Sequence, residues 1–121
     1  MKEMPLVTFA LFAFNQENYI EEAVEGAFSQ TYSPLEIILS DDCSTDRTFE
    51  ILEEKVLSYT GPHKVRLNRN VPNVGLIAHV TKVQEMATGA FIVTAAGDDI
   101  SMPDRVAELV EVWLSRKVAA V

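Results

Sequence analysis

Residues 36–48 read EIILSDDCSTDRT. The apolar, β-branched residues at the start are typical of a strand that is buried on both faces. A pair of aspartates, Asp41 and Asp42, follows directly, and residues 44–46 supply oxygens that can cap a helix running to about residue 59. This order of strand, acidic pair, polar turn and helix indicates an α/β sheet with a ligand site at the carboxyl end of the strand.

A second acidic pair follows a second strand-like run. Residues 91–97 read FIVTAAG and lead to Asp98 and Asp99. The carboxyl ends of parallel strands lie at one edge of a sheet, so we expect both pairs to converge on one pocket. Adjacent like charges are unfavourable unless they are solvated, hydrogen-bonded or bridged by a cation. Because carboxylates suit Mg²⁺ and Mn²⁺, the pattern predicts a metal-assisted site for a phosphorylated ligand.

The rest of the chain alternates between strands and helices in the same way. Further strands are expected at residues 7–14, 65–68 and 90–95, and further helices at residues 19–30, 76–87 and from 103 onward. This order predicts an α/β, Rossmann-like, mostly parallel sheet with helices on both faces. We interpret residues 1–121 as a single domain. The apolar run at residues 118–121 predicts the start of another strand, and hence a truncated chain.

Composition excludes several classes of protein. With 121 residues, 48% hydrophobic and 23% charged, the chain is typical of a folded domain rather than a disordered one. A net charge of −8 argues against nucleic-acid binding, and a divalent cation is the simplest way to reconcile it with a phosphorylated ligand. The single cysteine, Cys43, excludes an internal disulfide and fits a cytoplasmic setting. The apolar run at residues 5–14 is shorter than the about 20 residues that span a bilayer.

Several motifs occur together in a recognisable order, at residues 6–15, 30–32, 36–48, 73–76, 88–92 and 98–99. In this order and spacing the chain strongly resembles the inverting glycosyltransferases of family 2. The resemblance spans nearly the whole chain, and its most specific part is the Asp-Asp-x-Ser-x-Asp-x-Thr segment that begins at Asp41. It implies a GT-A fold and the amino-terminal, nucleotide-sugar-binding portion of a longer enzyme.

The resemblance also implies roles for individual residues. Phe14 would pack against the nucleotide base, and Asp41 would accept a ring N–H. Asp98 would hold the ribose, and Asp99 would bind the divalent metal, Mg or Mn. Asp42 is expected to orient its neighbours more than to contact the ligand. The implied substrate-binding set is Ala13, Phe14, Asn15, Asp41, Asp42 and Asp98.

The reaction that the resemblance implies moves a sugar from a nucleoside-diphosphate-sugar donor to a hydroxyl of a saccharide or lipid-linked acceptor, with inversion. The metal would neutralise charge on the departing nucleotide. The catalytic base, a carboxylate in this family, is expected downstream of residue 121, so these residues are expected to bind donor without turnover. The protein is expected in the cytoplasm, with membrane association through parts not present here left open, as is homo-oligomerisation.

Two departures from the family's pattern affect the site. The first Asp of the common Asp-x-Asp-Asp is Ala96, which predicts weak metal binding without nucleotide. The common Ala-Arg-Asn is His79-Val80-Thr81, which puts the usual donor contacts there in doubt. We interpret His79 as a hydrogen-bonded or surface histidine rather than a ligand contact, and His63 as a solvated loop residue.

Two alternative functions stay open. A non-catalytic nucleotide-binding or interaction module on the same fold fits the replacements at Ala96 and Thr81. A phospho-accepting receiver domain also uses acidic pairs on a doubly wound sheet. That domain needs an acidic pair after its first strand, however, where this chain has Ala-Phe-Asn at residues 13–15, so it fits poorly.

Overall fold

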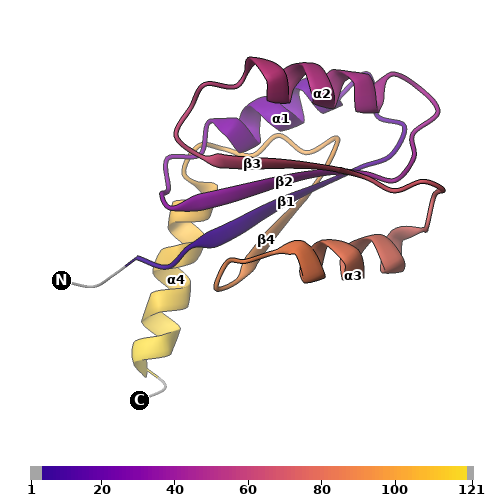
Figure 1. The fold of residues 1–121 in the computed structure, drawn as a ribbon. Coiled ribbons are helices and arrows are strands. Elements are labelled where there is room, and N and C mark those ends of the chain that lie inside the picture. Colours follow the sequence, from indigo (N-terminus) through magenta and orange to yellow (C-terminus); the bar gives the residue numbers. More distant parts are fainter. Residues whose placement is uncertain (1–3, 120–121) are drawn as a thin grey trace.

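The structure is a computed structural model that describes residues 4–119. Strands and helices alternate as β1 (Val7–Ala13), α1 (Ile20–Phe28), β2 (Leu35–Asp41), α2 (Thr48–Ser58), β3 (Lys64–Arg69), α3 (Leu76–Met86), β4 (Ile92–Ala96) and α4 (Arg105–Ala119). The strands form one sheet in the order β3-β2-β1-β4, and every pairing is parallel (Figure 1). The predicted α/β class with a mostly parallel sheet is therefore confirmed.

Helices cover both faces of the sheet, as predicted. Figure 1 shows α1 and α2 on one side and α3 on the other. The larger core cluster joins one side of the sheet to α1, α2 and α4, and its strand residues include Phe9, Leu11, Ile37 and Leu39. A smaller cluster on the opposite side holds Ala10, Ile38 and Val83, with Phe12 packed against it.

The alternation of side chains along β1 and β2 explains why both segments are continuously apolar. Phe9 and Leu11 face the larger cluster, whereas Ala10 between them faces the smaller one. Because successive strand residues point to opposite faces, a strand covered on both sides needs apolar residues at every position. Each fully buried Leu or Phe contributes about 2 kcal/mol through removal of apolar surface from water.

The expected strand at residues 118–121 is wrong for the part that the structure describes. Helix α4 continues through Val118 and Ala119. In sequence, positions 106, 110, 114 and 118 are each four residues apart, which matches the helical period, and alanine has the highest helix propensity. The apolar run therefore extends the helix. Residues 120–121 lie outside the described residues.

His63 also differs from expectation, because it is buried rather than solvated. Its side chain is 8% exposed, and its Nε2 lies 2.8 Å from the carbonyl oxygen of Gln30, to which it donates. The backbone N–H of His63 donates to the hydroxyl of Tyr59. Gly61 and Pro62 mark a turn correctly, but the turn folds the imidazole inward, where it ties the end of α2 to the end of α1.

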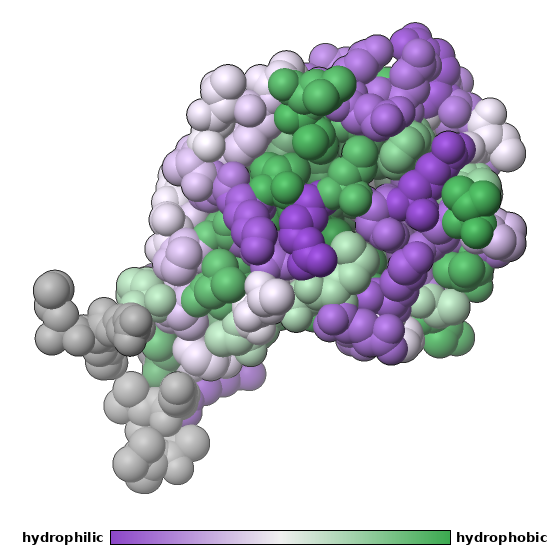
Figure 2. Space-filling model, viewed as in Figure 1, coloured by the Kyte–Doolittle hydropathy of each residue, from purple (hydrophilic) through white to green (hydrophobic). Residues whose placement is uncertain are grey.

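The surface mixes apolar and polar side chains, which interleave on the face shown in Figure 2. Exposed large hydrophobic residues include four around the start of α3: Val71, Val74, Leu76 and Ile77. Of the helices between residues 4 and 119, none combines the length and the apolar composition that a membrane span requires.

Candidate functional site

The order of the strands places both acidic pairs at the same edge of the sheet. Strand β1 lies between β2 and β4, and Phe12 pairs in register with Ser40 on one side and Ala96 on the other. The chain adds β2 and β3 on one side of β1 and then crosses over to add β4 on the other. Ligands of open α/β sheets bind at such a reversal, outside the carboxyl ends of the strands.

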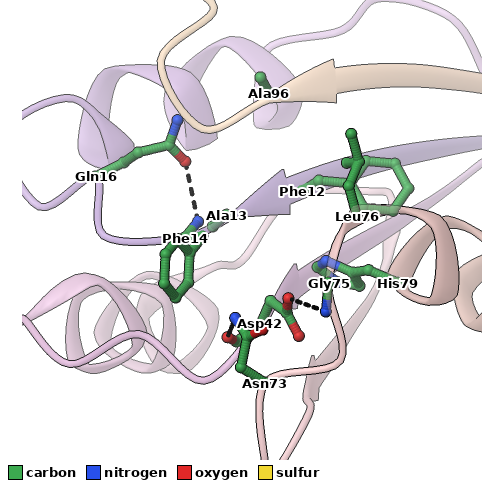
Figure 3. A pocket seen from close by; sticks show the side chains of 10 residues that line it. All are labelled: Phe12, Ala13, Phe14, Gln16, Asp42, Asn73, Gly75, Leu76, His79 and Ala96. Carbon is green, nitrogen blue, oxygen red and sulfur yellow. Dashed lines mark hydrogen bonds between the residues drawn. The ribbon is translucent and has the colours of Figure 1, made fainter.

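A pocket of about 440 Å³ lies at this edge, on the side of the sheet that α3 covers. Figure 3 shows the residues that line it: Phe12, Ala13, Phe14, Gln16, Asp42, Asn73, Gly75, Leu76, His79 and Ala96. They come from the ends of β1 and β4, the segment after β2 and the start of α3. Aromatic rings and few polar groups in one concave site are typical of a small-molecule pocket.

Asp42 is the carboxylate of the first pair that lines this pocket. It is 5% exposed, and Oδ1 accepts hydrogen bonds from the side chain of Asn70 (3.0 Å) and the backbone N–H of Val74 (2.9 Å). Oδ2 accepts one from the backbone N–H of Gly75 (3.0 Å). Burial alone would raise the pKa of Asp42, but these hydrogen bonds outweigh it and lower the pKa below the ordinary value. The carboxylate is therefore ionised, and it holds the loop between β3 and α3.

The loop also fixes its own shape around Asp42. The side chain of Asn73 donates to the backbone oxygen of Asp42 at 2.8 Å. Gly75 has a φ of 83°, in the left-handed region where a side chain is strained. The Asn-x-Gly motif therefore has a physical role, because Asn73 closes the loop and Gly75 makes the turn that brings its N–H to Asp42.

Asp41 is not among the residues that line the pocket. Its side chain is fully buried, and its two oxygens accept hydrogen bonds from the backbone N–H of Ser44 (2.8 Å) and from the Ser44 hydroxyl. The guanidinium of Arg69 lies 3.7 Å from Oδ2. Asp41 thus closes the turn after β2. Its assignment to the nucleotide base stays a prediction, and of the two carboxylates it is Asp42 that faces the pocket.

The loop after β1 is tied to the turn after β2. The backbone N–H of Asn15 donates to the Ser44 hydroxyl (2.9 Å), and its side-chain oxygen accepts from the N–H of Thr45 (2.8 Å). Asn15 has a φ of 49°, a left-handed conformation that asparagine tolerates better than most residues. Asn15 therefore ties the loop after β1 to the turn after β2, and it does not line the pocket. Ala13 and Phe14 do line it, and Phe14 is 47% exposed.

The second acidic pair is exposed. The backbone N–H of Ala96 donates to Oδ2 of Asp99 at 3.2 Å, and Asp98 has no hydrogen bond to another residue within 4–119. Asp99 lines a neighbouring hollow together with Ile100 and Asp104. The two acidic pairs thus share one sheet edge, as expected, but not one pocket, because Asp42 lines the pocket whereas Asp98 and Asp99 do not.

The carboxylate oxygens of the second pair are suitable ligands for a hard cation that is also bound by a substrate. Within the described part of the chain, no three His, Cys, Asp or Glu side chains are grouped closely enough to hold a metal by themselves. Mg²⁺ is commonly bound by one or two carboxylates together with substrate phosphates, and retains several waters. Exposed carboxylates at Asp98 and Asp99 fit that kind of site, and Ala96 supplies no third oxygen.

His79, near the start of α3, is hydrogen-bonded, as predicted, and it lies buried in the lining of the pocket rather than on the surface. It is 3% exposed and lines the pocket, and its Nε2 lies 2.6 Å from the hydroxyl of Ser40. Its ring meets that of Phe12 edge to face, with centroids 5.0 Å apart. Burial lowers the pKa of His79, although the negative charges of Asp42 and Asp41 oppose this effect.

Sequence reasoning missed several lining residues. Phe12 faces the pocket side of β1 because it lies two positions after Ala10, which faces the smaller cluster. That alternation was a usable signal. For Gln16, no sequence signal indicated a place in the lining. Its Oε1 accepts a hydrogen bond from the backbone N–H of Phe14 at 3.1 Å, and a Cβ at position 97 would lie 2.3 Å from the same oxygen. A side chain at position 97 would therefore require the Gln16 side chain to move.

Comparison with known proteins identifies the family. The family described as Glycosyl transferase family 2 matches residues 8–121. The chain is 34% identical to the putative glycosyltransferase EpsE of Bacillus subtilis over 87% of its own length and 37% of EpsE. It is 31% identical to the hyaluronan synthase of Pasteurella multocida over 99% of its length and 12% of that protein. The chain therefore spans little more than a third of EpsE and far less of the synthase.

Solved structures share the fold. The mannosyltransferase PcManGT of Pyrobaculum calidifontis, in complex with GDP-Man and Mn²⁺, aligns with a TM-score of 0.79 at 23% identity over 87% of this chain and 31% of that one. S. aureus TarS 1-349 aligns with a TM-score of 0.74 at 21% identity over the same shares. These likenesses confirm the predicted GT-A fold, and together with the match over residues 8–121 they show that the chain belongs to glycosyltransferase family 2.

Proposed function

We propose that this chain is the nucleotide-sugar-binding part of a glycosyltransferase that moves a sugar from a nucleoside-diphosphate donor to an acceptor hydroxyl with inversion. The observation that supports this most is the pocket beside β1, because it combines aromatic rings with one ionised, oriented carboxylate at the sheet edge where nucleotides bind. Family membership supports the reaction class.

Phe14 and Asp42 would receive the base. Phe14 is 47% exposed at the mouth of the pocket, so its ring has a free surface for stacking. Asp42 uses Oδ1 for two hydrogen bonds and Oδ2 for one. A carboxylate has about four lone-pair sites, so Oδ2 can accept one further N–H from a ligand.

Asp98 and Asp99 would hold the sugar-phosphate side of the donor. Asp98 would accept hydrogen bonds from the ribose hydroxyls, and Asp99 would bind Mg²⁺ or Mn²⁺ together with the diphosphate. When bound, such a cation stabilises the negative charge that develops on the departing nucleotide. The net charge of −8 supports this proposal, because the carboxylates alone would repel a diphosphate. No residue is assigned as the catalytic base.

The names of the relatives support the partners of the reaction. PcManGT was solved with GDP-Man and Mn²⁺, and TarS 1-349 with UDP-GlcNAc. Two relatives are named as synthases of hyaluronan and chondroitin, which supports a saccharide acceptor for this protein. A non-catalytic nucleotide-binding module on the same fold is the second candidate, favoured by Ala96 in place of an acidic residue.

Calorimetry with UDP and GDP, in Mn²⁺ and in EDTA, tests the proposal. We expect binding in Mn²⁺ and at least tenfold weaker binding in EDTA, because two unneutralised carboxylates would face the phosphates. Glu53→Gln is the control for net charge, because it removes an exposed carboxylate on α2, away from the second pair, and it should bind as the wild type does. Equal affinity in EDTA would contradict the metal requirement, and absence of binding in every condition would contradict the proposed function.

A further inference from the structure

We infer that Gly26 and Gln30 are positioning residues for the second acidic pair, because they hold the segment that follows Asp98 and Asp99 against α1. They fix the backbone that carries the two exposed carboxylates at the place where a cation and a diphosphate bind. The inference rests on the proposed function, since that function assigns the cation to Asp99. It also gives a role to the motif at residues 30–32, none of which lines the pocket.

The second acidic pair has few contacts of its own within the described residues, so its position depends on the chain on either side. Before the pair, the backbone N–H of Gly97 donates to the carbonyl oxygen of Phe12 at 2.8 Å, which ties the end of β4 to β1. After the pair, Ser101 is 6% exposed, and one residue separates it from Asp99. The pair therefore spans a short stretch between two fixed points.

Gln30 is the centre of the second fixed point. It lies two residues after α1 and is 4% exposed. Its Nε2 donates to the carbonyl oxygens of Met102 at 2.7 Å and Gly26 at 3.0 Å, and its Oε1 accepts from the backbone N–H of Val106 at 3.0 Å. This N–H lies in the first turn of α4, where helical N–H groups lack a partner within the helix. The amide therefore uses both donors and its acceptor to join α1 to residues 102–106.

Gly26 allows the same segment to approach α1 closely. A Cβ at position 26 would lie 2.9 Å from both the backbone nitrogen and the backbone oxygen of Ser101, so a side chain there would force the segment to move. Glycine inside a helix is less favourable than alanine, because it loses more conformational freedom on folding. The contact with Ser101 gives a physical reason for glycine at this position of α1.

Further hydrogen bonds hold the same region. The backbone N–H of Thr31 donates to the carbonyl oxygen of Pro103 at 2.9 Å, and the Thr31 hydroxyl donates to the same oxygen at 3.2 Å. The buried His63 donates from Nε2 to the carbonyl oxygen of Gln30 at 2.8 Å, which fixes the backbone of Gln30 from the side of β3. Figure 1 shows the segment between β4 and α4 passing beside α1. We call the contacts of Gly26, Gln30 and Thr31 with residues 101–106 the clamp.

A metal site is the kind of site that depends most on such a clamp. Ligand distances must lie within about 0.2 Å of their ideal values, and Mg²⁺ requires nearly ideal octahedral geometry. A segment that is displaced or loosened must also be ordered when the ligand binds, which lowers affinity. Contacts to the base come from the pocket, which shares no residue with the clamp. Disturbing the clamp should therefore weaken the metal-dependent part of nucleotide binding more than the rest.

Two variants disturb the clamp in different ways. Gln30→Met keeps the volume of the side chain and removes its hydrogen bonds, whereas Gly26→Ala adds a methyl group against Ser101. In both we expect UDP affinity in Mn²⁺ to fall about tenfold and affinity in EDTA to fall by less than about twofold, because no charge changes and the metal geometry is what suffers. Isothermal titration in the two conditions measures the split.

Leu52→Val is the matched control for a general loss of stability. Leu52 is fully buried on α2 and belongs to the larger core cluster, away from the clamp. The variant should keep the wild-type ratio of affinities in Mn²⁺ and EDTA. Thermal melts establish that each variant is folded. Gly26→Ala gains helix propensity, which offsets part of its strain, so it carries the test if Gln30→Met does not fold.

A spectroscopic measurement tests the clamp without metal or nucleotide. In ¹H–¹⁵N spectra, Gly26→Ala should shift the backbone amide signals of Asp98 and Asp99. The amide of Asp42 is the internal control, because it donates to the carbonyl oxygen of Ala13 and has no contact with the clamp, so its signal should stay in place. Unchanged signals of Asp98 and Asp99 in every folded clamp variant would overturn the inference whatever the protein binds.

The two proposals fail differently. Absence of UDP and GDP binding to the wild type in every condition would refute the proposed function and, with it, the role of the clamp in metal binding. Binding to the wild type that depends on Mn²⁺, with the same ratio of affinities in Mn²⁺ and EDTA in the clamp variants, would refute the inference alone and leave the proposed function intact.

Discussion

The ends of β2 and β4 carry the same dipeptide in opposite environments. Asp41 and Asp42 are 0% and 5% exposed, and together they accept hydrogen bonds from three backbone N–H groups. Asp98 and Asp99 are exposed, and one backbone N–H reaches them. The first pair is therefore part of the folded structure before any ligand arrives. The second pair is open to solvent, and under the proposed function a cation would reduce the repulsion between its carboxylates.

The strongest test of this contrast is Asp42→Asn. An amide in place of the carboxylate would turn one acceptor oxygen into a donor, which would face either the N–H of Gly75 or the N–H groups of Val74 and Asn70. We expect the free energy of unfolding to fall by about 3 kcal/mol, as measured by urea denaturation. Asp98→Asn is the matched control and should change stability by less than about 0.5 kcal/mol. Equal losses in the two variants would abolish the contrast.

The next effect concerns binding at the exposed pair. Asp99→Asn should lower UDP affinity in Mn²⁺ about tenfold, about 1.4 kcal/mol, because it would remove the proposed metal ligand, and it should not lower affinity in EDTA, where it removes a charge that repels the phosphates. Isothermal titration in both conditions measures the two affinities. Equal weakening with and without metal would show that Asp99 acts on the nucleotide directly.

A smaller effect is expected in the loop that joins β1 to the buried pair. Asn15→Ala should lower the free energy of unfolding by about 1 kcal/mol, because alanine is strained at a φ of 49° and cannot accept from Thr45. Asn15→Gly separates the two causes, since glycine adopts this φ without strain. If the two variants are equally unstable, the hydrogen bond rather than the backbone conformation stabilises the loop.

The smallest effect is a dependence of stability on pH through His79. Its folded-state pKa is lowered, so the unfolded chain binds more protons than the folded one below the ordinary value of about 6.5. Stability should therefore decrease as the pH falls from about 7 to 5, and less so in His79→Gln. The pKa of Asp42 is lowered too, so its contribution is present above about pH 4 and is lost only at lower pH.

Urea midpoints for wild type and His79→Gln across this range measure the difference. A parallel pH profile in the two proteins would show that His79 does not titrate differently in the folded and unfolded chains.

Much of the architecture followed from sequence because its signals are local. Apolar runs bounded by polar turns gave the strands of the sheet, and the acidic pairs marked the edge where ligands bind. What sequence reasoning did not address was the orientation of side chains at the end of β2. Residues 39 and 41 share a face of β2, so Asp41 points with Leu39 toward the larger core cluster, and Asp42 is left to face the pocket. Applying the period of two to the last strand residue would have distinguished them.

Other features were out of reach of local patterns. His63 follows a Gly-Pro turn that indicates a loop, and nothing in its neighbours shows that the ring packs against the carbonyl of Gln30, 33 positions earlier. The polar chain from Asn68 through Ser40 to His79 joins β3, β2 and α3, which meet only in the folded sheet. Long-range contacts of this kind depend on topology rather than on propensity.

The three hydrogen bonds to Asp42 have a consequence for the thermodynamics of ligand capture. A side chain already fixed in one rotamer loses little conformational entropy when a base docks against it, whereas the exposed carboxylates at 98 and 99 must give up their freedom at that moment. Under the proposed function, the base end of a nucleotide would meet a rigid, preorganised carboxylate, and the phosphate end would meet groups that become ordered only on association.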